Sequence, residues 1–428
     1  MKKQLLQTIR GTYDILPKDM SLWQKIIEAS ELSAELHGFS KIETPIMEYS
    51  WIFSKAIGEE TDIVSKEMYY LRHKEADMPV ALRPEGTAGV IRAYYQHGMH
   101  NLPSPQRLYY IGPMFRHERP QRGRWRQFYQ FGIESIGEGD ASEDALSIML
   151  GIHFLSILGI KNTQYSVELN TIGCKICRPR YIKKLKSYLK KYTPKLCADC
   201  IQRSKSNPLR VLDCKKRNCR KILNGAPNIL DYVCPDCNSH FKSLLEYLDE
   251  AGVKFEVRNN IVRGLDYYTQ TVYEIISKSG TTRDQAIIAG GRYNDLVSLY
   301  GRRNAPAVGF GAGIERIITL MRELNLNENV ASKSPQVFII QLGQTAKKKV
   351  FQIIKQLTGA GIYVQTALSK DSLKSQLKSA SRKKAKLALI LGQREILDKS
   401  IIIKDLTCGT QETVDIDKYL TVVLERLK

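Results

Sequence analysis

The sequence predicts an α+β protein, in which a body built on an antiparallel sheet with flanking helices carries a helical, cysteine-rich insertion and precedes a C-terminal α/β domain. Three observations support this fold class. Short strand patterns separated by turns dominate the first part of the chain. Eight of the nine cysteines fall between Cys174 and Cys237, and strand and helix patterns alternate toward the C-terminus.

Within the body, apolar residues at helical spacing predict a helix over 21–36, followed by an alternating strand over 41–46 that ends on a proline. Further helices are predicted over 141–158 and 314–324. The remaining patterns predict short strands over 80–83, 108–111, 127–133, 165–169, 253–257, 270–276 and 286–289. This run of short strands and turns is typical of an antiparallel sheet.

The expected domains are a body over 1–170 and 256–325, an insertion over 171–255, a polar linker over 326–334 and a C-terminal domain over 335–428. In the last of these, strands at 337–340, 363–364, 387–391 and 400–404 alternate with helices at 346–357 and 371–384. Such alternation predicts a small α/β domain.

The composition excludes several classes of protein. With 43% hydrophobic and 25% charged residues, the chain is neither disordered nor fibrous. Its longest apolar stretch, near 148–160, is shorter than a membrane span, so no membrane partner is expected. The N-terminus has neither an apolar signal core nor a small-residue cleavage site, which predicts a cytoplasmic protein.

The net charge of +21 is concentrated in two regions. Residues 171–255 hold 19 basic against 7 acidic side chains, residues 335–428 hold 17 against 8, and the rest of the chain is balanced. A nucleic-acid phosphate backbone is the partner that best uses such regions. Solvated lysine-rich helix faces are the alternative interpretation.

The clustered cysteines form four pairs, three of them with C-x-x-C spacing: Cys174/Cys177, Cys197/Cys200, Cys214/Cys219 and Cys234/Cys237. Two thiolates at this spacing can hold one tetrahedral zinc from a tight turn. We therefore expect one or two structural Zn²⁺ ions, with the grouping of the pairs left open. Reduced thiols without metal, or a redox pair, are the alternatives, whereas disulfides are not expected without a secretion signal.

Two further motifs indicate an anion site. Five arginines lie between Phe115 and Phe128, and so many cations repel one another unless they share an anion such as a polyphosphate. The run Gly-Phe-Gly-Ala-Gly-Ile-Glu-Arg over 309–316 leads from a strand pattern into a helix, where backbone can approach an anion closely. For the first motif, a flexible surface loop is the alternative.

The order of these motifs resembles motifs 1, 2 and 3 of the class II aminoacyl-tRNA synthetases: helix and strand ending at Pro45, Phe-Arg-His-Glu at 115–118, and Gly-Ala-Gly-Ile-Glu-Arg at 311–316. Three runs resemble the histidyl-tRNA synthetase family in particular: Leu-Arg-Pro-Glu-Gly-Thr at 82–87, Val-Arg-Gly-Leu-Asp-Tyr-Tyr at 262–268 and Ala-Gly-Gly-Arg-Tyr at 289–293. The resemblance spans residues 9–414. It implies a class II catalytic domain, with an insertion and a C-terminal anticodon-binding domain.

The activity implied is that of a histidine-tRNA ligase, which uses ATP to convert L-histidine to histidyl-adenylate, releases pyrophosphate, and transfers histidine to the 3′ end of tRNA(His). Charge gathers on the phosphates and needs preorganised cations, and the carboxylate nucleophile needs no general base. By resemblance, Arg263 and Arg116 are catalytic and Mg²⁺ accompanies ATP. The implied ATP-binding residues are Arg116, Glu118, Arg124, Phe128 and Arg316.

The resemblance also implies a histidine pocket, in which an ammonium and two ring nitrogens need polar partners. Glu85, Thr87 and Gln130 would hold the ammonium. Glu134 and Tyr268 would bracket the imidazole, and Tyr267 would form the pocket wall. A salt bridge to an arginine of the same sheet is the alternative role for each carboxylate.

For the second reaction, the resemblance places Arg119 and Gln121 near the tRNA acceptor end. It also implies that the C-terminal domain binds the anticodon loop. Motif 1 forms the dimer interface throughout the class, so a homodimer is expected. One departure is Asn294, where many relatives carry aspartate; it would remove a negative charge near the nucleotide.

Two alternatives belong to other functional classes. A paralogue of these enzymes is the histidine-binding regulatory subunit of ATP phosphoribosyltransferase, but it is expected to lack or alter the Arg263 run, the arginine-rich loop and the C-terminal domain. A zinc-containing nucleic-acid-binding module without catalysis would explain the charge and the cysteines. Such a module would not explain the runs at 82–87 and 262–268.

Overall fold

The computed structural model describes residues 6–72, 78–119, 123–301, 304–326 and 334–427. The chain divides into two compact units, Met1–Val330 and Ala331–Lys428, each with its own hydrophobic core. Most of the expected linker over 326–334 lies outside the described residues. No helix in the described ranges is long and apolar enough to cross a bilayer.

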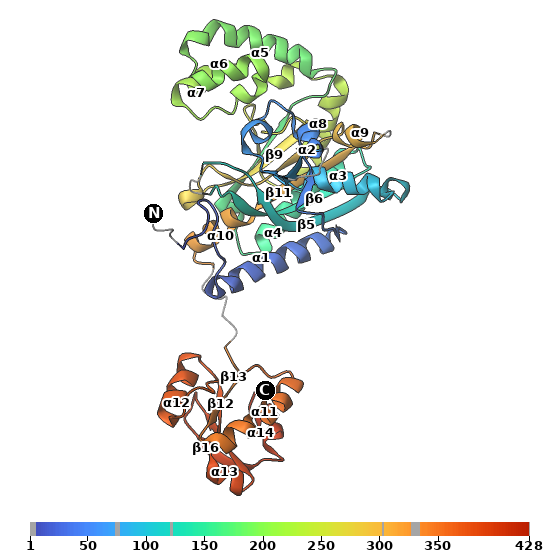
Figure 1. The fold of residues 1–428 in the computed structure, drawn as a ribbon. Helices are drawn as coiled ribbons and strands as arrows, with labels where there is room; N and C mark the ends of the chain where they lie inside the picture. Colours follow the sequence, from blue (N-terminus) through green and yellow to red (C-terminus); the bar gives the residue numbers. More distant parts are fainter. Residues whose placement is uncertain (1–5, 73–77, 120–122, 302–303, 327–333, 428) are drawn as a thin grey trace. The chain divides into compact units, whose positions relative to one another are not determined.

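Eight strands form the central sheet of the first unit, in the order β1-β5-β6-β11-β10-β9-β7-β8 (Figure 1). Their bounds are β1 (Ser40–Lys41), β5 (Gln106–Phe115), β6 (Gln127–Ile136), β7 (Tyr165–Thr171), β8 (Phe255–Val257), β9 (Thr269–Ser277), β10 (Ala286–Arg292) and β11 (Ala307–Gly313). The inner pairings are antiparallel, as expected, whereas the edge pairs β1/β5 and β7/β8 are parallel.

The strand expected over 41–46 is wrong beyond its first residue. The Ile42 N–H still donates to a carbonyl of β5 at 2.8 Å, but the chain then leaves the sheet. The carbonyl of Thr44 accepts from the guanidinium of Arg83 at 2.8 Å instead. Pro45 has no N–H to offer a strand ladder. Alternation alone therefore overestimated the length of this strand.

Helices α1 (Pro17–Leu36), α4 (Ala141–Ile157) and α10 (Ile314–Glu323) cover one face of the sheet (Figure 1). On β6, Phe131 and Ile133 point to this face and belong to the apolar cluster that these helices share. Because strand side chains alternate, the even-numbered residues of β6 face the other way. On β6 this opposite face carries the polar Gln130 and Glu134, beside the apolar Phe128 and Ile136.

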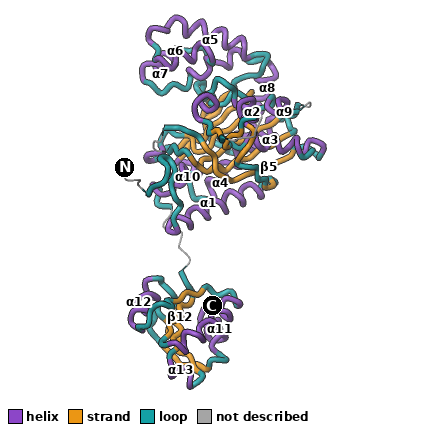
Figure 2. The backbone as a smooth tube through the Cα atoms, viewed as in Figure 1, coloured by secondary structure: helices purple, strands orange, loops and turns teal. Residues whose placement is uncertain are grey.

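Shorter elements surround that opposite face, and Figure 2 shows helices on both sides of the strand layer. They are α2 (Ser50–Ile57), α3 (Thr87–Gln96), α9 (Leu296–Tyr300) and a three-stranded sheet, β2-β4-β3, whose strands are β2 (Met47–Tyr49), β3 (Tyr70–Leu71) and β4 (Val80–Leu82). Their apolar residues form a second cluster, shared with the insertion.

The cysteine-rich segment is helical, as predicted. It contains α5 (Arg178–Tyr192), α6 (Ala198–Ser206), α7 (Arg217–Leu223) and α8 (Pro235–Glu250). Helix α8 packs on α4, and its residues Phe241 and Leu244 lie in the cluster beneath the central sheet. The end of the expected insertion is therefore built into the core of the body, while its boundaries over 171–255 stay a prediction.

The second unit is an α/β domain, as predicted, with a five-stranded sheet in the order β13-β12-β14-β15-β16. Its strands are β12 (Val337–Gln341), β13 (Val364–Thr366), β14 (Leu387–Leu391), β15 (Ser400–Asp405) and β16 (Gln411–Asp415). Its helices are α11 (Gln344–Gly359), α12 (Leu373–Arg382), α13 (Gln393–Leu397) and α14 (Tyr419–Leu427). The last strand and helix had no counterpart in the sequence-based expectations.

Candidate active site

A pocket of about 470 Å³ opens on the face of the central sheet opposite helices α1, α4 and α10. It brings together most of the residues predicted from the sequence, although they come from distant segments of the first unit. Those that line it are Glu85, Thr87, Arg116, Glu118, Arg124, Phe128, Gln130, Arg263, Tyr267, Tyr268 and Arg316.

At the inner end of the pocket, Glu85 is held by the start of helix α3. Its carboxylate accepts hydrogen bonds from the N–H groups of Thr87 at 2.8 Å and of Ala88 at 2.9 Å. These two N–H groups have no acceptor within the helix, because they lie in its first turn. The Tyr267 hydroxyl donates to the same carboxylate at 3.5 Å. Burial raises the pKa of Glu85, although the two N–H bonds oppose the shift.

Glu134, on β6, does not line the pocket but lies fully buried directly behind its inner end. Thr87 donates its hydroxyl to this carboxylate at 2.7 Å, and Tyr293 donates to the other oxygen. Burial raises the pKa of Glu134 to about 8, against the opposing hydrogen bonds from Tyr293 and Thr87. Glu134 can therefore reach a bound ligand through Thr87 and Tyr293.

The glycines of the 309–316 run make room for side chains rather than for a ligand alone. A Cβ on Gly309 would lie 2.3 Å from the Glu134 carboxylate, and a Cβ on Gly311 would lie 1.9 Å from the Gln130 amide. Both glycines belong to β11, which pairs with β6 in this register. Larger residues would displace the polar side chains that β6 presents to the pocket.

The outer end of the pocket is strongly cationic. Arg116 follows β5, donates to the carbonyl of Pro84 at 2.8 Å, and lies over the ring of Phe128 with 5.3 Å between the guanidinium carbon and the ring centroid. Arg124 donates to Glu118 at 2.9 Å. These positions point the guanidinium groups at one volume, which suits an anion with several oxygen atoms.

Arg316 extends this cationic end from the first turn of α10. Its guanidinium donates to the carbonyls of Gly123 at 3.1 Å and Ala286 at 2.7 Å. Burial lowers its pKa, and the neighbouring charge of Arg124 adds to the shift. An anion in the pocket would relieve this repulsion.

Arg263 lies between the two ends, in the loop that precedes β9. It pairs with Glu274 of β9 at 2.6 Å, and its guanidinium carbon lies 5.3 Å from the ring centroid of Tyr268. Its Nε is buried and has no hydrogen-bond partner among the described residues. A buried guanidinium nitrogen without an acceptor is a donor ready for a ligand oxygen.

Several lining residues were not anticipated. Glu274 is recognised only as the partner of Arg263, and Asp213 and Lys215 come from the insertion. Tyr293, which donates to Glu134, lies in the run at 289–293 but was not assigned a role. The basic excess of the insertion was a signal that it meets an anion, but it did not identify these positions.

Three residues singled out in the sequence, two for the tRNA acceptor end and one near the nucleotide, lie outside the pocket or outside the described residues. Arg119 does not line the pocket, and Gln121 lies outside the described residues. Asn294 is also absent from the lining, because its amide oxygen accepts from the Ala307 N–H at 3.2 Å and its amide nitrogen donates to Gln270 at 2.9 Å. Asn294 therefore does not itself contact a ligand in the pocket.

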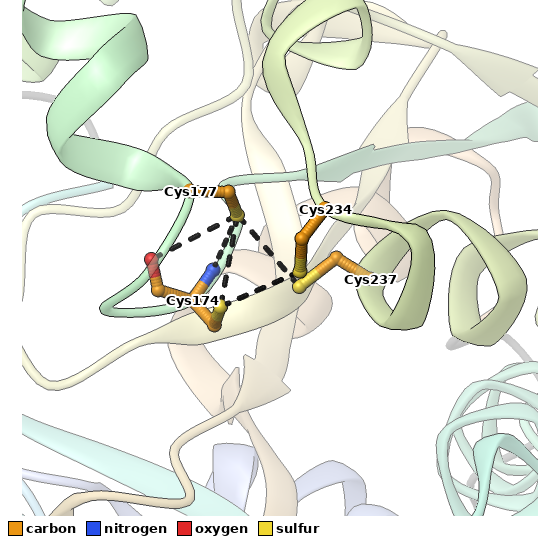
Figure 3. A group of neighbouring side chains, drawn as sticks. All are labelled: Cys174, Cys177, Cys234 and Cys237. Atoms are coloured by element: carbon orange, nitrogen blue, oxygen red, sulfur yellow. Dashed lines mark hydrogen bonds between the residues drawn. The ribbon is translucent and has the colours of Figure 1, made fainter.

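The eight clustered cysteines form two groups of four, whose sulfur atoms lie within 4.8 Å of one another in each group. The first group, Cys174, Cys177, Cys234 and Cys237, joins the start of α5 to the start of α8. Figure 3 shows its four sulfurs pointing toward one another. The Sγ atom of Cys174 lies 3.7 Å from that of Cys177 and 3.7 Å from that of Cys234.

Those separations match a tetrahedral metal site. Four sulfurs at the usual Zn–S distance of about 2.3 Å are about 3.8 Å apart, whereas a disulfide would need about 2 Å. The second group, Cys197, Cys200, Cys214 and Cys219, joins the starts of α6 and α7 to the loop between them. There the N–H of Cys197 donates to the sulfur of Cys219 at 3.3 Å. The chemistry and spacing of both groups fit zinc.

Comparison with known proteins identifies similar chains over the whole length. A family model described as Histidyl-tRNA synthetase matches residues 11–317, and one described as Anticodon binding domain matches residues 336–426. A Histidine–tRNA ligase of Thermodesulfovibrio yellowstonii is 44% identical, covering 99% of this chain and 98% of that protein. One from Halothermothrix orenii is 42% identical, covering 94% and 95%.

Solved structures are similar as well. The apo histidyl-tRNA synthetase of S. aureus has a TM-score of 0.81 at 30% identity, covering 99% of this chain and all of that one. A Bacillus halodurans chain titled as an ATP phosphoribosyltransferase regulatory subunit/histidyl-tRNA synthetase has a TM-score of 0.62 at 21% identity, covering 91% and 98%. At that identity, the second match shows a shared fold alone.

Proposed function

Because the chain belongs to the histidyl-tRNA synthetase family and is a histidine-tRNA ligase, we propose that the described pocket activates L-histidine with ATP. The convergence of Arg116, Arg124, Arg263 and Arg316 on one pocket beside a buried acidic end is the observation that carries this assignment. One end suits a polyphosphate, and the other suits an amino acid with a cationic ammonium.

In the first step, an oxygen of the histidine carboxylate attacks the α-phosphorus of ATP. A bond to this oxygen forms, the bond to the β-phosphate bridging oxygen breaks, and pyrophosphate leaves with the electron pair. Arg263 and Arg116 stabilise the charge that develops on the α-phosphate. Arg124 and Arg316 hold the outer phosphates, while Glu118 orients the nucleotide and Phe128 stacks on adenine.

At the inner end, Glu85, Thr87 and Gln130 hold the ammonium of histidine. Tyr268 and, through its partners Thr87 and Tyr293, Glu134 interact with the imidazole. Reading both ring nitrogens by hydrogen bonds rejects amino acids of similar shape, since their binding would leave buried polar groups unpaired. The burial of Glu134 supports this role, because a mismatch there is most costly.

In the second step, the hydroxyl of the terminal tRNA adenosine attacks the histidyl carbonyl and AMP leaves. Arg119 and Gln121 are proposed to meet the acceptor end. The second unit, which the anticodon-binding family model matches, is proposed to take the anticodon loop of tRNA(His). Its excess of basic residues supports contact with phosphates.

Zn²⁺ is proposed for both cysteine groups, in structural roles. Four thiolates complete the coordination of zinc and leave no open position for a substrate. Metal analysis of protein purified without added metal should find two equivalents. Detection of eight titratable thiols and no metal in the folded protein would contradict the assignment.

Mg²⁺ is proposed to accompany ATP, as the counter-ion of its phosphates. Glu118 and Glu274 are lining carboxylates of suitable chemistry, but each is already engaged with an arginine, at 2.9 and 2.6 Å. These carboxylates fit a shared contact to a nucleotide-bound ion rather than a permanent metal site.

A homodimer is proposed through the first helix and the small sheet that follows it. The strands β2 and β3 leave Met47, Tyr49 and Tyr70 exposed, which is an unusual apolar grouping for a free surface. Light scattering at micromolar concentration should give twice the mass of the chain; a monomer mass would refute the proposal. The cytoplasm is the proposed location, since tRNA charging serves translation there.

The test of the function is histidine-dependent exchange of pyrophosphate into ATP, measured with each of the twenty amino acids. Exchange with histidine alone, strongly reduced in Arg263→Ala, is expected. Exchange with another amino acid would overturn the assignment of the inner end. Saturable histidine binding without exchange would favour the regulatory-subunit alternative, which the comparisons support less.

A further inference from the structure

The insertion contributes two side chains of its own to the active-site pocket. Asp213 and Lys215 line it together with Arg263. A second cavity of about 510 Å³ is also lined by Asp213 and Lys215, along with Arg220 of α7 and Arg258 from the body. The two cavities share these insertion residues, so Lys215 stands where the active site opens toward the space between insertion and body.

The position of Lys215 follows from its neighbour in the chain. Cys214 is buried in the second cysteine group, whereas Asp213 and Lys215 on either side of it are exposed. Asp213 lies in a turn that the Cys214 N–H closes onto the Val211 carbonyl at 3.1 Å, and the Cys214 sulfur points into the group. The sulfur group therefore holds the loop, and its flanking charged residues are presented to the cavities.

The same segment is tied to the body by polar contacts. Arg210 pairs with Asp62 at 3.1 Å, and Arg203 reaches the same carboxylate at 3.4 Å. Asn207 donates to Asp266, which belongs to the Arg-Gly-Leu-Asp-Tyr-Tyr run, at 2.7 Å. Both ends of the loop are thus fixed: one by the body beside the active site, the other by the thiolate group.

Among the described residues Lys215 forms no ion pair, although the charge of the neighbouring Asp213 carboxylate acts on it. The adjacent Lys216, in contrast, pairs with Asp199 at 3.2 Å. Arg116, Arg124 and Arg316 line the same pocket and favour an anion there. The carboxylates of Asp213 and Asp284 line it too, whereas that of Glu274 is already paired with Arg263. Asp213 beside Lys215 can accept a hydrogen bond from a ribose hydroxyl, which matches a nucleotide.

We propose that Lys215 is a further phosphate-binding residue of the active site, delivered by the insertion and positioned by the thiolate group of Cys197, Cys200, Cys214 and Cys219. The proposal rests on the ligase function proposed above. The phosphate belongs either to ATP or to the 3′ end of tRNA, since both bring a ribose phosphate to this pocket. The chemistry of the contact is the same in both cases.

The test compares Lys215→Ala with Lys216→Ala, which removes the same charge one residue away and outside the pocket. We expect Lys215→Ala to raise the KM for either ATP or tRNA about ten-fold, because it removes one charge-assisted hydrogen bond at a solvent-open site. Lys215→Arg should restore most of the lost affinity. Lys216→Ala should match the wild type.

Two assays distinguish the source of the phosphate. A raised KM for ATP in pyrophosphate exchange identifies an ATP phosphate. Unchanged exchange with a raised KM for tRNA in aminoacylation identifies a tRNA phosphate. Normal values in both assays for Lys215→Ala would overturn the proposal while leaving the ligase function intact. Absence of histidine-dependent exchange in the wild type would instead refute the function itself.

The positioning role of the thiolate group is tested by Cys219→Ser, with Cys234→Ser as the matched change in the other group. Each variant is expected to lose one equivalent of zinc. Only Cys219→Ser should reproduce the defect of Lys215→Ala, and adding Lys215→Ala to it should cause no further loss. A folded Cys219→Ser protein that has lost zinc and keeps wild-type kinetics would overturn this role. Lys215→Ala alters no thiolate and tests the phosphate contact even if Cys219→Ser does not fold.

Discussion

The inner end of the pocket presents buried side chains that bond to one another, whereas the outer end presents guanidinium groups that are partly open to solvent. Glu85 is 3% exposed and Glu134 is not exposed at all, while the side chain of Arg124 is 45% exposed. The inner groups have raised pKa values because burial disfavours their charge. The outer groups are cations held near one another.

This difference matches the two ligands proposed for the pocket, L-histidine and ATP. An amino acid must be distinguished from nineteen others, and buried hydrogen-bonding groups provide selectivity because a mismatch leaves them unpaired. A nucleotide must be bound, reacted and released as pyrophosphate and AMP. Solvent-open cations suit that task, because each one binds a phosphate with moderate energy and the products can leave. Together they stabilise the charge of the transition state.

The largest expected effect is at Arg263, where the two ends meet. Arg263→Ala should lower kcat for histidine-dependent exchange about 10³-fold, because it removes a preorganised cation from the reacting phosphate. Steady-state exchange kinetics measure this, with the exposed Arg180→Ala as control. A loss confined to KM would show that Arg263 binds substrate without acting in the transition state.

At the inner end, Tyr268→Phe should lower kcat/KM for histidine about ten-fold, since one hydroxyl partner of the imidazole is lost. The KM for ATP should stay unchanged. Exchange kinetics with each substrate varied in turn measure both values, and Tyr165→Phe on β7, outside the pocket, is the control. An equal change in the KM values for histidine and ATP would contradict the proposal that the two ends bind different substrates.

Glu134 makes the inner end sensitive to pH. Its pKa is about 8 in the folded protein against an ordinary value of 4.5, so its contribution to stability is complete below pH 4.5 and is lost as the pH rises through about 8. Glu134→Gln should remove this dependence and change the pH slope of the unfolding free energy by up to ~1.4 kcal/mol per pH unit. Urea unfolding without ligands between pH 5 and about 8.5 tests this; parallel slopes in the two proteins would contradict it.

The smallest effect is expected at the solvent-open outer end of the pocket. Arg124→Ala should raise the KM for ATP about three-fold and leave the KM for histidine unchanged, because this half-exposed guanidinium is also paired with Glu118. Exchange at varied ATP concentration measures the change. An effect as large as that of Arg263→Ala would mean that this outer end closes over ATP and excludes water.

Much of the fold and the site was predictable from local pattern. Helix α10 has a clear periodicity, because it buries one face against the core, whereas α4 is apolar around much of its circumference and shows little periodicity. The strand predicted over 41–46 was too long, because alternation does not reveal where a chain leaves a sheet. The motifs predicted residues that line both ends of the pocket, since each motif is a short run of polar residues close together in the chain.

The sequence by itself determined the family, the fold class and the chemical character of the site, because these are carried by residues close together in the chain. The tertiary structure decided which distant groups meet: Cys174 with Cys234, Glu274 with Arg263, and Lys215 with the mouth of the active site. Spacing along a chain cannot specify such encounters. They depend on how helices and strands pack, and packing is set by the whole core rather than by any one segment.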